Sequence, residues 1–301
     1  ELIDFNLLIE NIKVKDISYF GMLDEQTGYI RLTRFSRNSD QEMKDALENL
    51  IENNMTGLIL DLRDNPGGLL NSAVNILDMF TEKGQLLVYT KGKTYKSKRK
   101  YLSKSEPLVP ENLKITVLVN QGSASASEIV AGVLQDVDRG VVIGRSTFGK
   151  GLVQTVINID RERSLKITSA KYYIPSGRLI QKPGYLPKEL LADTSTVDSV
   201  FFTKGGRSVS GLGGITPDYI VELKNLEPLL SASLRKGLFF SFVQKNKNNY
   251  NSFEQVENDL SIIDNFENYI YSNNINVKMK GESKYTKMKE DLLDLDSSSV
   301  Q

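Results

Sequence analysis

The chain has 301 residues, with 38 Lys and Arg side chains balanced by 38 Asp and Glu, and it contains neither histidine nor cysteine. The lack of histidine excludes a Ser-His-Asp triad and imidazole metal ligands. The lack of cysteine excludes thiolate nucleophiles, disulfides and iron–sulfur sites. Any hydrolytic chemistry must therefore use hydroxyl, lysine or carboxylate side chains, or a metal held by oxygen ligands.

The zero net charge gives no sign of a nucleic-acid partner. No run of about 18 apolar residues occurs, so no membrane span is predicted. Along the chain, residues 5–20 and 28–35 favour β structure, and Ser39 opens a helix that continues to about residue 54. The length allows one large domain or two small ones.

Two strand–turn–helix units follow. Residues 56–63 (TGLILDLR) are almost continuously apolar, which predicts a strand covered on both faces, followed by the turn Asn65-Pro66-Gly67-Gly68 and a helix at about 70–80. The second unit has a strand at 113–120, a helix at 123–136, a short strand at 141–144 and a loop at 146–151. This order predicts an α/β layered fold.

The remaining segments are less regular. Two β segments are expected at 152–159 and 165–174, a glycine-rich loop at 205–214 and a last short strand in GITPDYIVEL. Residues 91–100 (KGKTYKSKRK) hold six Lys and Arg in ten positions, and we interpret them as a solvated hairpin or loop. From about residue 225 the pattern predicts a helical appendage with a disordered tail.

The segment GSASASEI (122–129) places three serines between a strand and a helix start. A helix N-terminus offers free backbone N–H groups and a positive dipole end, which suits a developing oxyanion. Ser125 and Glu128 also match the S-x-x-E capping box, so Ser125 could simply cap the helix. Spacing alone leaves the choice among Ser123, Ser125 and Ser127 open.

A serine nucleophile needs a base, and without histidine the best candidate is lysine. A free lysine has a pKa of about 10.4, and burial lowers it. Lys150 lies between two glycines in TFGKGLVQ, directly before a strand, although a Gly-Lys-Gly turn is often only an exposed loop. Gly67 and Gly68 could likewise present an N–H to an oxyanion or only form a turn.

The sequence gives only weak signals for a nucleotide or a metal ion. No GxxxxGK[ST] phosphate loop occurs, because Lys150 is followed by Gly151. The acidic residues that could bind a metal are dispersed over the two units, so surface or helix-end roles are favoured. These residues are Asp61, Asp64, Asp136 and Asp138.

Three motifs, DLRDNPGG (61–68), NQGSASASEIVAG (120–132) and GRSTFGKGLVQ (144–154), together resemble the carboxyl-terminal processing peptidases, also called tail-specific proteases. GYIRLTRF, AKYYIPSGRLIQ and GITPDYIVEL resemble further segments of that family. The resemblance implies a Clp-protease/crotonase-like α/β core at residues 21–224 with a mainly helical C-terminal appendage at 225–301. It implies no cofactor and no metal.

The same resemblance implies the roles of individual residues. Ser125 would be the nucleophile and Lys150 its general base, with Gln154 orienting the lysine. The backbone N–H groups of Ala126 and of either Gly67 or Gly68 would form the oxyanion hole. Which glycine contributes stays open at this stage.

The implied activity is a serine endopeptidase that cleaves proteins near their C-termini in the bacterial cell envelope. Its partners would be substrate C-termini and, further, a homo-oligomer or an adaptor protein. A PDZ domain normally precedes such a core and captures the substrate C-terminus by strand addition. Residues 1–20 resemble only the end of a PDZ domain and its linker, so this chain is expected to lack one.

Two alternatives stay open. One is a catalytically silent or gated peptide-binding scaffold on the same core, in which Ser125 only caps a helix. The other is a crotonase-like acyl-CoA enzyme, which rests on fold analogy alone.

Overall fold

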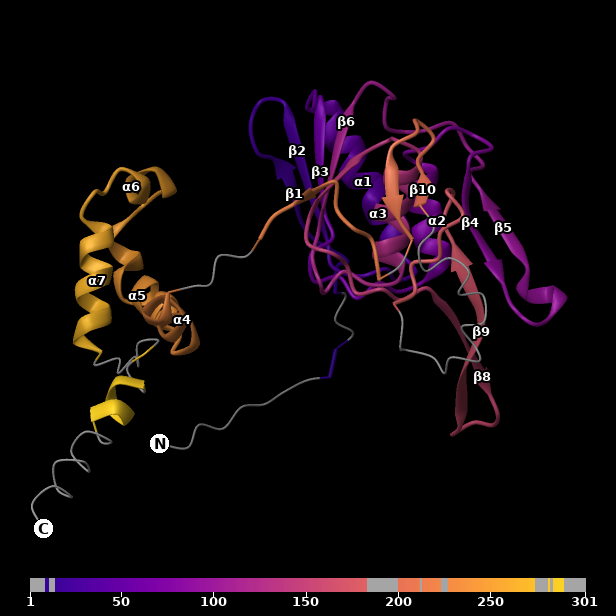
Figure 1. Cartoon of the computed structure of the whole chain (residues 1–301). Helices are drawn as coiled ribbons and strands as arrows, with labels where there is room; N and C mark the ends of the chain where they lie inside the picture. The colour runs from indigo at the N-terminus through magenta and orange to yellow at the C-terminus, as the bar shows by residue number, and fades with distance from the viewer. Residues whose placement is uncertain are drawn as a thin grey trace, which may run out of the picture. The chain divides into compact units, whose positions relative to one another are not determined.

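The computed structural model describes residues 9–10, 14–182, 200–211, 213–222, 227–273, 281 and 284–289. The chain forms two compact units, Glu1–Glu222 and Leu223–Gln301, each of which is described by itself (Figure 1). The disordered tail predicted at the C-terminus, and most of the β structure predicted before residue 14, lie outside the described residues.

A six-stranded sheet is the centre of the first unit, in the order β1-β2-β3-β6-β7-β12. Strand β1 pairs antiparallel with β2, and the other neighbours are parallel. Parallel neighbours need crossover connections, which the strand–turn–helix units supply. The strands are β1 (Ile17–Met22), β2 (Thr27–Leu32), β3 (Gly57–Asp61), β6 (Lys114–Val119), β7 (Val141–Gly144) and β12 (Tyr219–Ile220).

Three helices, α1 (Ser39–Glu52), α2 (Leu70–Asp78) and α3 (Ala126–Asp136), pack against one another beside this sheet (Figure 1). Alternate side chains of β3 are buried, among them Leu58 and Leu60, while Gly57 and Ile59 are partly exposed. The prediction that this strand is covered on both faces is therefore wrong for one face. The alternation shows that the core lies on a single side of the sheet.

A second sheet is fully antiparallel, in the order β5-β4-β9-β8. Its strands are β4 (Leu86–Lys91), β5 (Arg99–Leu102), β8 (Leu152–Asn158) and β9 (Ser164–Tyr173). The basic stretch forms the connection from β4 through the short helix η1 (Tyr95–Ser97) into β5, which confirms the predicted hairpin. The β8–β9 hairpin projects from the body of this unit (Figure 1).

Two sequence predictions were wrong in detail. The glycine-rich loop contains β11 (Ser208–Ser210), which pairs with β10 (Val200–Phe202) because Gly206, at a φ of 86°, allows the tight turn between them. Helix α3 begins at Ala126 instead of residue 123, since Ser125 adopts a non-helical backbone conformation.

The second unit is helical where it is described, as predicted. Phe239 and Phe242 of one helix contact Phe266 of another, with ring centroids 4.4 and 5.1 Å apart. These contacts form its apolar interior. Its helices are α4 (Pro228–Arg235), α5 (Leu238–Asn246), η4 (Lys247–Asn249), α6 (Phe253–Glu257) and α7 (Ile262–Ser272). Among the helices of the described ranges, none has the length and apolar character needed to cross a bilayer.

Candidate active site

Ser125 occupies the junction between β6 and α3, where it is the N-cap residue of the helix. Its φ of 56° and ψ of −109° lie outside the ordinary left-handed region, in which ψ is about +30 to +60°. The other described non-glycine residues with positive φ are Asn or Asp, which tolerate such values more readily. A strained serine at a helix N-terminus is a feature typical of functional sites.

The structure distinguishes the three serines of the motif. Ser123 and Ser127 are fully buried, and their hydroxyls donate to backbone carbonyls, those of Leu62 at 2.7 Å and Asn65 at 2.9 Å. Ser125 is partly exposed and lines a pocket of about 360 Å³. Of the three hydroxyls, only that of Ser125 faces a space that a ligand can enter.

The glycine turn packs directly on residues 124–126. A Cβ atom on Gly67, which has a φ of 92°, would lie 2.4 Å from Ala124 O and 2.8 Å from Ala126 N. A Cβ on Gly68 would lie 2.0 Å from Phe35 O. Both positions therefore require glycine, because no side chain fits between these backbones.

The backbone donors near Ser125 are not all available. Gly67 N donates to Asn65 Oδ1 at 2.9 Å, and Ser125 N donates to Glu128 Oε2 at 2.7 Å. Within the described part of the chain, the N–H groups of Gly68 and Ala126 donate no hydrogen bond. Among the described residues these two N–H groups, one from the glycine turn and one next to Ser125, are therefore unpaired donors at the pocket.

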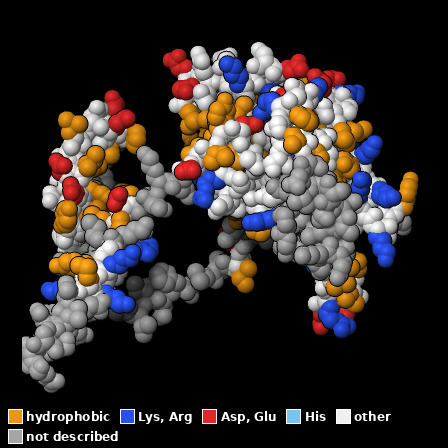
Figure 2. Space-filling model, viewed as in Figure 1, with side chains coloured by type: hydrophobic (Ala, Val, Ile, Leu, Met, Phe, Trp, Pro, Cys, Tyr) orange, Lys and Arg blue, Asp and Glu red, His pale blue; other side chains and the backbone are white. Residues whose placement is uncertain are grey.

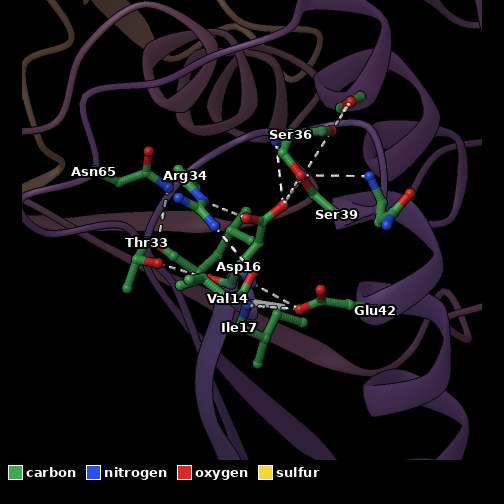
Figure 3. Close-up of polar contacts among 12 residues, drawn as sticks. Val14, Asp16, Ile17, Thr33, Arg34, Ser36, Ser39, Glu42 and Asn65 are labelled. Carbon is green, nitrogen blue, oxygen red and sulfur yellow. Dashed lines mark hydrogen bonds and ion pairs between the residues drawn. The ribbon is translucent and has the colours of Figure 1, made fainter. Parts of the chain in front are cut away.

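Asn65 holds this turn in place. Its Nδ2 donates to Leu32 O at 2.8 Å, at the end of β2, and its backbone O accepts from Ala124 N at 3.0 Å. Figure 3 shows Asn65 beside a second polar cluster, in which Asp16 accepts hydrogen bonds from Arg34 and Ser39. Asn65 thus joins the end of β2, the glycine turn and the segment that contains Ser125, through its side-chain amide for the first two and its backbone oxygen for the third.

Lys150 lies in the loop before β8, between Gly149 and Gly151. Its backbone N donates to Glu128 Oε2 at 2.9 Å, and its backbone O accepts from the Tyr172 hydroxyl. The side chain is partly exposed and lines the same pocket as Ser125. Within the described residues, no hydrogen bond joins Lys150 to Ser125 or to Gln154.

Glu128 connects the start of α3, where Ser125 lies, with the loop that contains Lys150. It is fully buried, and besides Ser125 N and Lys150 N its carboxylate accepts from Thr147 Oγ1 at 2.6 Å and Gly149 N at 2.7 Å. Burial raises the pKa of Glu128, and these hydrogen bonds partly offset that effect. The sequence predicted Glu128 only as the partner of Ser125 in a capping box, and this partnership is confirmed.

Tyr172 of β9 also contacts the segments that hold Ser125 and Lys150, in this case at their backbone carbonyl oxygens. Its buried hydroxyl donates to Lys150 O and lies 3.3 Å from Ser125 O. Burial first, and the charge of Glu128 second, raise the pKa of Tyr172 well above its ordinary value. Sequence reasoning missed this residue, although it lies within AKYYIPSGRLIQ, one of the segments that resemble the peptidase family.

All six predicted site residues line the one pocket: Gly67, Gly68, Ser125, Ala126, Lys150 and Gln154. The dispersed acidic residues do not converge on it. Asp61 pairs with Arg63, Asp136 with Arg178 and Asp138 with Arg207. The described residues contain no cluster of three or more carboxylates that could hold a metal ion.

The chain is similar to known proteins in both sequence and structure. The sequence model described as Peptidase family S41 matches residues 26–190. A carboxy-terminal-processing protease of Bartonella bacilliformis is 40% identical over 189 residues, which are 62% of this chain and 43% of that protein. The carboxy-terminal processing protease CtpA of Bacillus subtilis is 37% identical over 186 residues, 62% of this chain and 39% of that protein.

Among solved structures, a photosystem II D1 C-terminal processing protease matches with a TM-score of 0.53 at 28% identity, covering 71% of this chain and 50% of that one. A putative S41 protease from Bacteroides fragilis shares the fold at 16% identity, with a TM-score of 0.52 over 71% of this chain and 52% of that one. These matches confirm the predicted Clp-protease/crotonase-like α/β fold. The chain spans less than half the length of the two relatives named above.

Proposed function

Because the chain belongs to peptidase family S41, we propose that it is a serine endopeptidase that cleaves proteins near their C-termini, with Ser125 as nucleophile and Lys150 as general base. The observation that carries the proposal is the pocket in which a strained, partly exposed serine at a helix N-terminus meets a lysine. The composition supports it, because no histidine is available as the base and no cysteine as the nucleophile.

In this mechanism the neutral amine of Lys150 takes the proton of Ser125 Oγ as that oxygen attacks the peptide carbonyl. The tetrahedral intermediate collapses to an acyl-enzyme, and the protonated lysine gives its proton to the leaving amine. Lys150 then activates a water molecule that hydrolyses the ester. Gln154, which lies on β8 and lines the pocket, would orient the Lys150 amine.

We assign the oxyanion hole to the N–H groups of Ala126 and Gly68. An oxyanion needs donors that are free before the reaction begins. Gly67 N is already bonded to Asn65 Oδ1, whereas the Gly68 and Ala126 donors have no partner among the described residues. This donor count favours Gly68 over Gly67.

The proposal also covers the substrate, the cellular location and the assembly of the protein. The relatives' names describe carboxy-terminal processing, and several relatives are bacterial. By analogy we propose protein C-termini as substrates and the bacterial cell envelope as the location. Residues 21–224 would be the peptidase core, 225–301 a helical appendage, and a homo-oligomer or adaptor protein a further partner.

One observation favours the alternative of a gated or silent peptide-binding scaffold. Ser125 and Lys150 form no hydrogen bond with each other in the described residues, although both line the pocket. Catalytic hydrogen bonds often tighten only when substrate binds. The two functions differ in whether Ser125 reacts.

The test is covalent labelling of the full chain with a phosphonate probe, read by mass spectrometry, together with a peptidase assay. Labelling at Ser125 that is lost in Ser125→Ala and strongly slowed in Lys150→Ala supports the peptidase. The matched control, Lys44→Ala, changes an exposed lysine of α1 and should label normally. Unlabelled Ser125 with peptide binding retained would instead establish the scaffold.

A further inference from the structure

A second hollow adjoins the catalytic pocket. It has a volume of about 830 Å³ and is formed by β4, β5, β9 and the loop between β4 and β5. Leu152, at the start of β8, lines both hollows. The two hollows therefore meet at this residue, so a ligand bound in one lies next to the other.

The charges of this second hollow all have one sign, and we call it the basic groove. Its charged lining residues are Lys91, Lys93, Lys98, Arg99, Lys100 and Lys171. The catalytic pocket adds Lys150 and Lys166. No Asp or Glu occurs among the described residues that line either hollow.

This asymmetry is local, because the whole chain carries equal numbers of acidic and basic residues. The hollow beside β7 and β12 mixes signs: Arg207 there pairs with Asp138 at 2.7 Å and with Asp218 at 2.5 Å. In contrast, none of the six cations of the basic groove forms an ion pair within the described part of the chain. Their charge is left for a ligand.

The arrangement of the strands concentrates that charge. Lys91 of β4 lies opposite Lys171 of β9, and Tyr89 lies opposite Lys100 of β5. The rings of Tyr89 and Tyr173 stack at 4.9 Å, and the Lys91 ammonium lies 5.3 Å from the Tyr173 ring. Figure 2 shows Lys and Arg side chains over β4 and β5, at the right of the view. Neighbouring like charges repel, and an anionic ligand relieves that repulsion.

We propose that the basic groove binds an acidic segment of the protein substrate, adjacent to the bond that Ser125 attacks. This inference rests on the proposed peptidase function and adds the substrate class. Carboxylates of Asp and Glu complement the six cations, and the partly exposed ring of Tyr89 offers an apolar surface for the stems of those side chains. The basic stretch of the sequence thus acquires a role beyond solvation.

The first experiment measures binding without cleavage. The full chain carrying Ser125→Ala is titrated into a fluorescein-labelled peptide rich in Asp and Glu, and into the same peptide with Asn and Gln instead. We expect the acidic peptide to bind about tenfold more tightly at low ionic strength. This preference should fade as salt screens the charges.

Charge-reversal variants test whether the preference for the acidic peptide depends on the basic groove. Lys91→Glu combined with Lys171→Glu should abolish the preference for the acidic peptide. A matched control, Lys44→Glu with Lys83→Glu, reverses two exposed lysines outside the groove and should keep the preference. Equal loss in both double variants, or equal binding of the two peptides, overturns the proposal. Tighter binding of anionic vesicles or of RNA than of the acidic peptide overturns it as well.

Cleavage kinetics separate this inference from the proposed function. With Ser125 present, the groove reversal should raise KM for the acidic peptide and leave kcat within about twofold, because the reacting groups are unchanged. If both peptides are cleaved with the same KM, the groove proposal fails and the peptidase stands. If neither is cleaved while the binding preference persists, the peptidase proposal fails and the groove remains a site for acidic peptides.

Discussion

The two ends of helix α3 each bury a carboxylate, and they stabilise it in different ways. At the N-terminal end, Glu128 accepts four hydrogen bonds from neutral donors. At the C-terminal end, Asp136 faces the Arg178 guanidinium at 2.8 Å, and both side chains are fully buried. One helix therefore combines a carboxylate held by neutral donors with one held by a cation.

This difference has a chemical reason under the proposed mechanism. A carboxylate paired with the Lys150 ammonium would favour the charged amine and make it a poor base. Glu128 instead contacts Lys150 only through the backbone N–H, and no ion pair joins the two residues in the described ranges. The arrangement fixes the Lys150 backbone beside Ser125 through a hydrogen bond that does not involve the side-chain amine.

The largest effect on stability is expected at the C-terminal end of α3, where Asp136 lies. Arg178→Ala leaves the buried Asp136 charge without its cationic partner, with only the Ser176 backbone N–H still donating to it, which should lower the free energy of unfolding by about 3–5 kcal/mol. Urea denaturation followed by circular dichroism measures it. In the double variant with Asp136→Asn, much of that loss should be recovered. If Arg178→Ala costs under about 1 kcal/mol, the ion pair does not stabilise this end of α3.

At the N-terminal end of α3, Glu128→Gln should lower kcat about 10- to 100-fold. An amide cannot accept hydrogen bonds from all four donors, so the segments that hold Ser125 and Lys150 lose their shared acceptor. The accompanying stability loss should be only about 1–3 kcal/mol. Peptidase kinetics and urea denaturation on the same preparation check both values. Unchanged kcat with a large loss of stability would make Glu128 a structural residue like Asp136.

A smaller effect is expected for Tyr172→Phe, which removes only the hydroxyl that contacts Lys150 O and Ser125 O. We expect about a tenfold decrease in kcat, an unchanged KM and a stability loss of about 1 kcal/mol. Tyr19→Phe, which changes an exposed tyrosine of β1 outside both hollows, is the matched control. A rise in KM without a change in kcat would place Tyr172 in substrate binding instead.

The smallest effect concerns Asp61, a buried carboxylate outside α3 that accepts from Arg63 and from the Tyr29 hydroxyl at 2.6 Å. Burial opposes ionisation, but these hydrogen bonds outweigh it and lower the pKa of Asp61. The folded pKa thus lies below the unfolded one, so the stabilisation is complete above about pH 4 and is lost as the pH falls through the folded value. Urea denaturation from pH 7 to pH 3 should show this loss in the wild type and a flatter profile in Asp61→Asn.

Local patterns predicted the elements that carry the site. The apolar runs located β3 and β6, and the S-x-x-E spacing located the N-cap of α3 at Ser125, although the helix itself begins later than expected. These features depend on neighbours within a few residues, which is the range over which periodicity and capping operate.

The contacts that join these elements were not predictable in the same way. Asn65 reaches Leu32, and Glu128 reaches Gly149 and Lys150, across more than 20 positions of sequence. A local sequence pattern does not predict which backbone N–H groups will approach a buried carboxylate, because tertiary packing brings those groups together. The choice between Gly67 and Gly68 likewise needed the Asn65 side chain, whose acceptor removes one donor from consideration.

The shared acceptor on Glu128 also has a consequence for local opening of the protein. The amides of Ser125 and Lys150 bond to the same oxygen, so one movement of a single side chain exposes both to solvent. In native-state hydrogen exchange the two amides should show the same protection and respond together to denaturant, although 25 positions separate them (150 minus 125). The proposed nucleophile and its proposed base would then belong to one cooperative unit of the fold.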